Sequence, residues 1–165
     1  MITLAKRAQL LKPSPILVLA ARAGELKAAG NDVISLSIGE PDWSPYESIK
    51  EVAIASIREG KTKYTPAAGI PDLRKAVAAQ ATTDLGIPYD FTQVTVSTGA
   101  KFVLFAALQA LVNPGDEVIL VAPYWASYST MVELADGTPK EVICDHTVDF
   151  KLTPEILRKA ITRGD

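Results

Sequence analysis

A short run of small residues carries the clearest chemistry in the chain. Residues 94–101 read Val-Thr-Val-Ser-Thr-Gly-Ala-Lys, which predicts a β-strand, a tight turn containing Gly99, and then a helix. Such a turn points backbone N–H groups and the positive end of the helix dipole at the carboxyl edge of a sheet, where a phosphate can be held. Ser97 and Thr98 add hydroxyl donors. Many strand-to-helix turns carry glycine and serine for geometry alone, so the turn by itself fits either interpretation.

The next expected strand brings aromatic side chains to the same edge. Strand 117–121 is followed by Ala-Pro-Tyr-Trp-Ala-Ser-Tyr at residues 122–128. In a parallel sheet, two consecutive strand ends would place a phosphate site beside aromatic rings, which suits a flat phosphorylated heterocycle. Alternatively, Tyr124 and Trp125 only pack their loop onto the core. The turn lacks the glycine fingerprints of dinucleotide-binding and P-loop folds, so an ordinary nucleotide site receives little support.

The first half of the chain is predicted to be mostly helical. Hydrophobic periodicity and turn residues indicate helices at 16–29, 45–60 and 72–85, and one short strand at 33–38. For the second helix, Ser44 is expected as the N-cap, Pro45 as the first helical residue and Glu47 as the capping-box glutamate.

The second half follows the rhythm of βαβ units. Short β-rich runs at 94–96, 117–121 and 141–144 alternate with helices expected at 100–112, 128–135 and 153–162. The 100–112 helix is apolar nearly all round, as expected of a helix covered on several sides. The prediction is an α/β fold, with a mostly parallel sheet flanked by helices and preceded by an N-terminal helical segment. Because such sheets usually have about five or more strands, we expect the fold to be incomplete.

Composition and charge exclude several classes of function. The chain has 165 residues, 48% hydrophobic and 22% charged, which are ordinary values for a globular protein. Its 17 Lys and Arg residues against 19 Asp and Glu residues give a net charge of −2, so no basic field attracts nucleic acid or anionic lipid. Cys144, Asp145 and His146 are too few to predict a metal site.

The N-terminal region has a weak likeness to an export signal. Basic residues, among them Lys6 and Lys12, precede an apolar run at 15–21, but Pro15 opens that run and Arg22 closes it. No apolar run reaches the ~20 residues of a membrane span. We interpret this region as a helix of a cytoplasmic protein.

Five segments resemble class I aminotransferases in order and spacing. They are residues 37–42 (Ser-Ile-Gly-Glu-Pro-Asp), 63–74 (Lys-Tyr-Thr-Pro-Ala-Ala-Gly-Ile-Pro-Asp-Leu-Arg), 97–101 (Ser-Thr-Gly-Ala-Lys), 113–118 (Asn-Pro-Gly-Asp-Glu-Val) and 123–125 (Pro-Tyr-Trp). The resemblance begins at Lys12 and is to the N-terminal part of fold-type I pyridoxal-phosphate enzymes, most like bacterial aspartate or aspartate/prephenate aminotransferases. It implies that residues 1–44 contribute to a small domain and that residues 45–165 form an incomplete cofactor-binding large domain.

The resemblance also implies roles for particular residues. Gly99, Ala100 and Lys101 would receive the phosphate of pyridoxal 5'-phosphate, and Trp125 would stack on its ring. Tyr64 would reach the cofactor phosphate of a neighbouring subunit, which makes these enzymes homodimers with shared active sites.

Substrate contacts are implied as well. Gly39 would lie against the substrate α-carboxylate, while Ser14 and Lys101 would lie near a distal carboxylate, with Trp125 beside the substrate. Phe102, Ala106 and Ser129 depart from residues common in the family.

The family's catalytic Schiff-base lysine is not expected in this chain. Its eleven lysines all fall outside the Ser-Lys motif of the family, so no catalytic residue is assigned. The first hypothesis is the N-terminal portion of an aminotransferase that moves an amino group between an amino acid, aspartate or glutamate, and a 2-oxo acid, and that is inactive as this piece alone. The alternative is a stand-alone, non-catalytic module that binds a phosphate ligand or pairs subunits.

Overall fold

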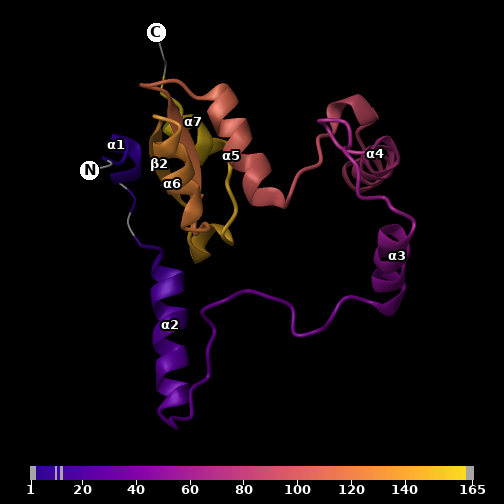
Figure 1. Cartoon of the computed structure of the whole chain (residues 1–165). Helices are drawn as coiled ribbons and strands as arrows, with labels where there is room; N and C mark the ends of the chain where they lie inside the picture. Colours follow the sequence, from indigo (N-terminus) through magenta and orange to yellow (C-terminus); the bar gives the residue numbers. More distant parts are fainter. Residues whose placement is uncertain (1–2, 10, 12, 163–165) are drawn as a thin grey trace. The chain divides into compact units, whose positions relative to one another are not determined.

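The computed structural model of the chain describes residues 3–9, 11 and 13–162 (Figure 1). Internal contacts divide the chain into two units. We call Met1–Ile38 together with Leu104–Asp165 the sheet unit, and Gly39–Val103 the helical unit. Lys12, where the family resemblance begins, lies outside the described residues.

The sheet unit contains two parallel strands, β1 (Glu117–Ala122) and β2 (Thr138–Ile143), joined through helix α6 (Ser127–Leu134). Their register runs from Glu117 opposite Thr138 to Ala122 opposite Ile143. One further bond, from the N–H of Cys144 to the carbonyl oxygen of Ala122 at 2.8 Å, extends the pairing. The expected parallel βαβ unit is confirmed, although β2 begins three residues earlier than predicted.

The two faces of this sheet are covered by different helices. On one face, Ile119 and Val121 pack with Val142, Cys144 and Ala160, the last of which comes from helix α7 (Pro154–Ala160). Because side chains alternate along a strand, Val118 and Leu120 face the other way. They line an apolar hollow of about 260 Å³ together with residues of α6 and of helix α5 (Ala100–Leu111). Helices on both faces of a parallel sheet confirm the predicted α/β class.

Helix α5 is less covered than its sequence suggested. None of its residues is buried, and Phe102 and Leu111 are 58% and 76% exposed. The sequence predicted that this helix is covered on several sides. Among the described residues, its apolar side chains are only partly covered.

Two predicted strands are absent from the described structure. Residues 33–38 form no ladder, and Ile34 and Leu36 are 87% and 93% exposed. Residues 94–96 are not a strand either, although Val94 has extended backbone angles (φ −109°, ψ 129°). A strand is stabilised by a neighbour that accepts and donates its backbone hydrogen bonds, and the described residues pair only β1 with β2.

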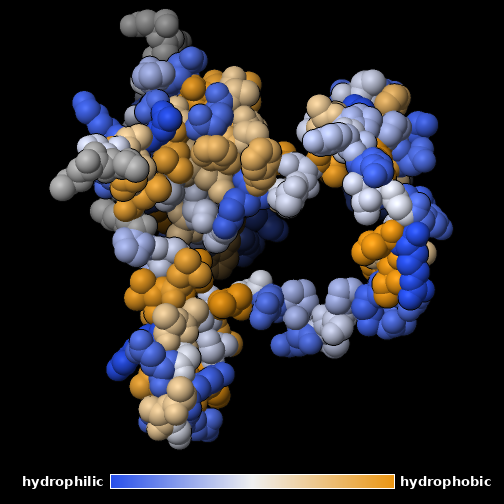
Figure 2. Space-filling model, viewed as in Figure 1, coloured by the Kyte–Doolittle hydropathy of each residue, from blue (hydrophilic) through white to orange (hydrophobic). Residues whose placement is uncertain are grey.

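The helical unit contains α3 (Glu47–Arg58), α4 (Pro71–Leu85) and the short 3₁₀ helix η1 (Phe91–Gln93). Helix α4 begins and ends within one residue of its predicted bounds. In α3, apolar side chains gather on one side and charged ones on the other, as Figure 2 shows. Its exposed apolar side chains are Ile49, Val52, Ile54 and Ile57.

The predicted start of α3 is wrong. The helix begins at Glu47 with Tyr46 as the N-cap, and no side chain caps it. Tyr46 has non-helical backbone angles (φ −55°, ψ 144°), so Ser44 lies two residues before the N-cap and the predicted capping box does not form. Glu47 instead pairs with Lys50 at 2.5 Å.

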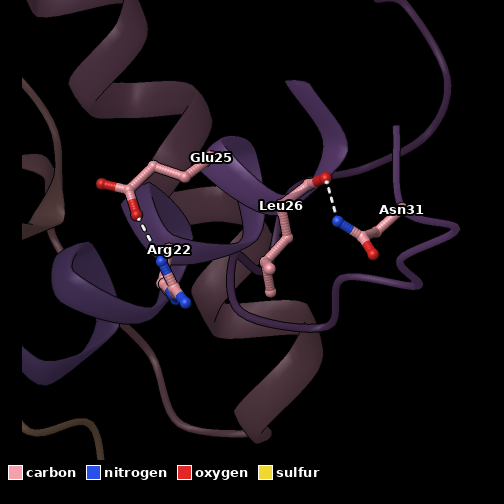
Figure 3. A network of polar contacts seen from close by, with 4 residues as sticks. All are labelled: Arg22, Glu25, Leu26 and Asn31. Atoms are coloured by element: carbon pink, nitrogen blue, oxygen red, sulfur yellow. Dashed lines mark hydrogen bonds and ion pairs between the residues drawn. The ribbon is translucent and has the colours of Figure 1, made fainter. Parts of the chain in front are cut away.

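Helix α2 (Pro15–Ala28) confirms the helix predicted over 16–29. Near its end, Asn31 donates both its backbone N–H and its side-chain Nδ2 to the carbonyl oxygen of Leu26, each at 3.1 Å (Figure 3). Arg22 and Glu25 form an ion pair at 2.9 Å on the same helix. The two bonds from Asn31 satisfy the carbonyl oxygen of Leu26, which has no N–H donor within the last turn of the helix.

The remaining elements are the single-turn helix α1 (Lys6–Gln9) and the 3₁₀ turn η2 (His146–Val148). Across the residues that the structure describes, no helix is long and apolar enough to cross a membrane. The same residues contain no group of three or more His, Cys, Asp or Glu side chains that could hold a metal ion.

Candidate functional site

The turn that the sequence predicts around Gly99 forms in the structure. Gly99 lies at φ +78°, its N–H donates to the carbonyl oxygen of Ser97 at 2.9 Å, and α5 begins at the next residue, Ala100. By helix geometry, the N–H groups of the first turn have no acceptor within the helix. A Cβ placed on Gly99 would meet no heavy atom within 4 Å, so the turn is open. An open turn at the start of a helix of 12 residues is the arrangement that a phosphate group fits.

Lys101 is the second residue of α5 and is exposed. Its ammonium group is a hydrogen-bond donor in the same turn as the first N–H groups of the helix, and both kinds of donor suit an anionic ligand.

The loop that carries Tyr64 is anchored to the residues that precede the turn. Val96 donates its N–H to the carbonyl oxygen of Ala68 at 2.9 Å. Gly69, at φ +99°, packs so closely that an added Cβ would lie 2.8 Å from the Cβ of Val96. Tyr64 itself is fully exposed, at 108% of its reference surface. Within the helical unit, the loop after Tyr64 therefore contacts the segment that precedes the Gly99 turn.

An aromatic cluster follows β1 in the sheet unit, after a cis peptide bond between Ala122 and Pro123. The rings of Trp125 and Tyr128 meet at 90° with centroids 5.6 Å apart. The rings of Tyr124 and Tyr128 lie nearly parallel, 16° apart, with centroids at 6.3 Å. Trp125 is half-buried, so the loop both packs inward and leaves part of the indole accessible.

The hydroxyl of Tyr124 donates a hydrogen bond to the carboxylate of Glu141 in β2. This hydrogen bond, followed by burial, raises the pKa of Tyr124 above its ordinary value of 10.0. Tyr124 therefore stays a neutral donor to Glu141 at physiological pH.

Ser14 and Gly39 are the two remaining residues that the sequence assigns to the site. Ser14 is the N-cap of α2 in the sheet unit, with φ −62° and ψ 122°, and its side chain makes no cap bond. Gly39 belongs to the helical unit, is exposed, and has no heavy atom within 4 Å of an added Cβ. Its φ also lies outside the left-handed region. Nothing among the described residues requires glycine at position 39.

The sequence interpretation overlooked Glu141 and gave Tyr128 no role of its own. Glu141 was treated only as part of a β-rich run. The predicted strand 141–144 placed Glu141 at the start of the strand, whereas β2 runs from Thr138 to Ile143 and brings Glu141 two residues before its end.

The family of the chain is shown by its similarity to known proteins. Residues 31–165 match the family described as aminotransferase class I and II. The chain belongs to this family, whose members are pyridoxal-phosphate-dependent enzymes, and its fold is the N-terminal part of the fold-type I architecture.

Particular relatives narrow the comparison. The chain is 49% identical to an aspartate/prephenate aminotransferase of Cereibacter sphaeroides over 92% of this chain and 38% of the relative. It is 45% identical to an aspartate aminotransferase of Geobacillus stearothermophilus over 96% of this chain and 40% of the relative. A solved aspartate aminotransferase of Thermus thermophilus with maleate matches with a TM-score of 0.91 and 42% identity, covering 98% of this chain and 42% of that structure. The chain thus spans about two fifths of the length of these relatives.

Proposed function

We propose that this chain forms the N-terminal portion of an aminotransferase that moves an amino group between an amino acid, aspartate or glutamate, and a 2-oxo acid. Family membership and the aspartate and aspartate/prephenate aminotransferases among its relatives support this proposal. In this proposal residues 1–44 contribute to a small domain, and residues 45–165 belong to the large, cofactor-binding domain.

The observation that carries the proposal is the open Gly99 turn at the start of α5. We assign the cofactor phosphate to this turn, with Ala100 and Lys101 in the first helical turn beside it. The N–H of Gly99 donates to the carbonyl oxygen of Ser97 in the structure. This hydrogen bond would have to break before the N–H of Gly99 could bind the phosphate. The helix start supplies donors and a favourable dipole without that change.

We assign the stacking position on the cofactor ring to Trp125, which lies in the loop after β1. Tyr64 is assigned to the cofactor phosphate of a second subunit. Its full exposure supports a partner outside its own chain, and the proposal therefore includes a homodimer with shared sites.

Substrate recognition is assigned to Gly39, Ser14, Lys101 and Trp125. Gly39 has open space where a side chain would otherwise project, which leaves room for the substrate α-carboxylate. Lys101 and the hydroxyl of Ser14 suit a distal carboxylate, since an ammonium group and a hydroxyl both donate to carboxylate oxygen.

Bound pyridoxal phosphate would supply the electron sink that lets an amino acid lose its Cα proton. The residues of this chain hold its phosphate, orient its ring and select the substrate. The lysine that moves the proton is assigned to sequence beyond the matched motifs, so the 165 residues alone are proposed to be inactive. We also propose a cytoplasmic location. The comparisons do not favour the alternative of a stand-alone binding module.

Phosphate recognition can be tested on the chain itself with pyridoxine 5'-phosphate. This compound lacks the aldehyde that reacts with any exposed lysine, and pyridoxine without the phosphate is its control. We expect saturable binding, measured by tryptophan fluorescence or calorimetry, for the phosphorylated compound only.

Gly99→Ala should weaken that binding, because alanine is strained at φ +78°. The matched variant Gly86→Ala strains a glycine at φ +65° at the end of α4, with equally open space around it, and should leave binding unchanged. Equal binding of both compounds, or equal losses in both variants, would contradict the assignment.

A further inference from the structure

We propose that Glu141 is a positioning residue for Trp125, acting through the side chains of Tyr124 and Tyr128. The inference rests on the proposed function, in which Trp125 stacks on the cofactor ring. Through Glu141, strand β2 would thus help to set the orientation of Trp125 against the cofactor ring.

The first link is the hydrogen bond from the hydroxyl of Tyr124 to the carboxylate of Glu141. Glu141 lies in β2, opposite Leu120 in the register, whereas Tyr124 lies two residues beyond the end of β1. The bond therefore ties the loop after one strand to the neighbouring strand. A bond to an ionised acceptor is stronger than one between neutral groups.

The second link is the pair of ring contacts through Tyr128. Its ring lies nearly parallel to that of Tyr124 and perpendicular to that of Trp125. Both are preferred geometries for aromatic pairs. Tyr128 also donates its backbone N–H to the carbonyl oxygen of Trp125 at 2.9 Å, so the indole and its backbone are held by the same residue.

Tyr128 is itself fixed by the rest of the sheet unit. It lies in the first turn of α6 and lines the apolar hollow with Leu108 of α5 and Met131 of α6. The Tyr128 side of the cluster is therefore held by packing, and the Tyr124 side is tied to β2 by the bond to Glu141. Loss of that bond should free Tyr124 first and then Trp125, while the packed side remains.

The test measures, in the absence of any ligand, how firmly the side chain of Trp125 is held. The chain has two tryptophans, and Trp43 is 84% exposed, so Trp43→Phe leaves Trp125 as the single reporter. In this background, Tyr124→Phe and Glu141→Ala should increase acrylamide quenching of Trp125, because the bond between Tyr124 and Glu141 no longer holds the cluster. Both should also weaken the near-ultraviolet circular dichroism of the indole.

Glu141→Gln keeps an acceptor oxygen and should restore most of the Trp125 signal. Tyr89→Phe and Glu155→Ala make the same chemical changes at Tyr89, after α4, and at Glu155 in α7, and should leave the signal unchanged. Because Tyr124→Phe removes one hydroxyl and keeps the ring, it remains informative if Glu141→Ala lowers stability.

A Trp125 signal that is unaltered in Tyr124→Phe and Glu141→Ala would overturn the proposal. It would also be overturned if Trp125 loses order in these variants but pyridoxine 5'-phosphate binds them as it binds the parent. Failure of the parent chain to bind this compound would count against the proposed function instead, while the ligand-free spectra would still decide whether Glu141 orders Trp125.

Discussion

Val96 and Ala68 are joined by a backbone hydrogen bond of 2.9 Å, which links the segment before the Gly99 turn to the loop that follows Tyr64. Val96 precedes the Gly99 turn by three residues, and Ala68 follows Tyr64 by four. Residues 94–96 have no ladder partner among the described residues, so this single bond and the close packing of Gly69 hold them against the Tyr64 loop.

Substituting Gly69 should therefore damage the helical unit. In Gly69→Ala, the new methyl would be strained at φ +99° and would lie 2.8 Å from the Cβ of Val96. We expect a loss of about 2–3 kcal/mol in the free energy of unfolding. Gly60→Ala imposes a similar strain at φ +74° with no heavy atom within 4 Å and should cost about 1–2 kcal/mol. Urea unfolding of both variants measures the difference, and equal losses would show that the Val96 contact contributes nothing.

Arg74 should be replaceable by lysine only at a cost. Its Nε donates to the carbonyl oxygen of Val94 at 2.8 Å, and its guanidinium lies 5.2 Å from the centre of the Phe91 ring. Lysine keeps the charge but loses the planar fork that makes both contacts together. We expect Arg74→Lys to lower the free energy of unfolding by about 1 kcal/mol. Arg58→Lys, at the exposed end of α3, is the control, and a matching loss there would refute the specific role of Arg74.

The stability of the sheet unit should depend on the ionisation of Glu117. Hydrogen bonds from Thr162 and then from Lys140, the latter at 3.0 Å, lower the pKa of this carboxyl below its ordinary value of 4.5. Because the folded-state pKa is the lower one, the stabilisation is fully present above the unfolded-state pKa and is lost as the pH falls through the folded-state pKa.

Glu117→Gln should consequently unfold more easily than the parent near neutral pH, and the difference should shrink under acid conditions. Thermal unfolding across a pH series measures it. Glu155→Gln removes the same charge from an exposed ion pair on α7 and should show a smaller difference, because exposed pairs of this kind contribute little. A constant difference between Glu117→Gln and the parent at all pH values would contradict the linkage.

Local signals predicted helices well and strands poorly, for a physical reason. Helix α4 could be recognised because its hydrogen bonds lie within its own residues and Gly86 ends it in the left-handed conformation. Residues 33–38 have an equally clear alternating pattern, but a strand also depends on a neighbour, and among the described residues they have none. The start of α3 was mispredicted because Tyr46 adopts non-helical backbone angles (φ −55°, ψ 144°) that its residue type does not specify.

The candidate site divides in the same way. The Gly99 turn was predictable because its glycine, helix start and hydroxyl residues are contiguous in sequence. The bond between Tyr124 and Glu141 joins residues 17 positions apart, and it depends on the register of β1 and β2, which the sequence pattern alone does not specify. Tyr64, Trp125, Gly39 and Ser14 were assigned by resemblance, and their roles remain predictions.

Ser14 and Thr153 occupy the same position at the start of two helices and should respond differently to alanine. Thr153 accepts a hydrogen bond from the N–H of Ile156 at 3.3 Å and so caps α7. Thr153→Ala should therefore lower the free energy of unfolding by about 1 kcal/mol. Ser14 makes no such bond at the start of α2, and Ser14→Ala should leave stability nearly unchanged.

This difference separates a capping serine from a ligand-binding one. If Ser14 serves the substrate, Ser14→Ala should weaken binding of a dicarboxylate such as maleate, measured by calorimetry, while the unfolding curve stays in place. Thr153→Ala should move the unfolding curve and leave binding by the folded chain unchanged. A loss of stability in Ser14→Ala equal to that in Thr153→Ala would identify Ser14 as a helix cap. It would contradict the expectation that Ser14 acts in recognition and not in stability.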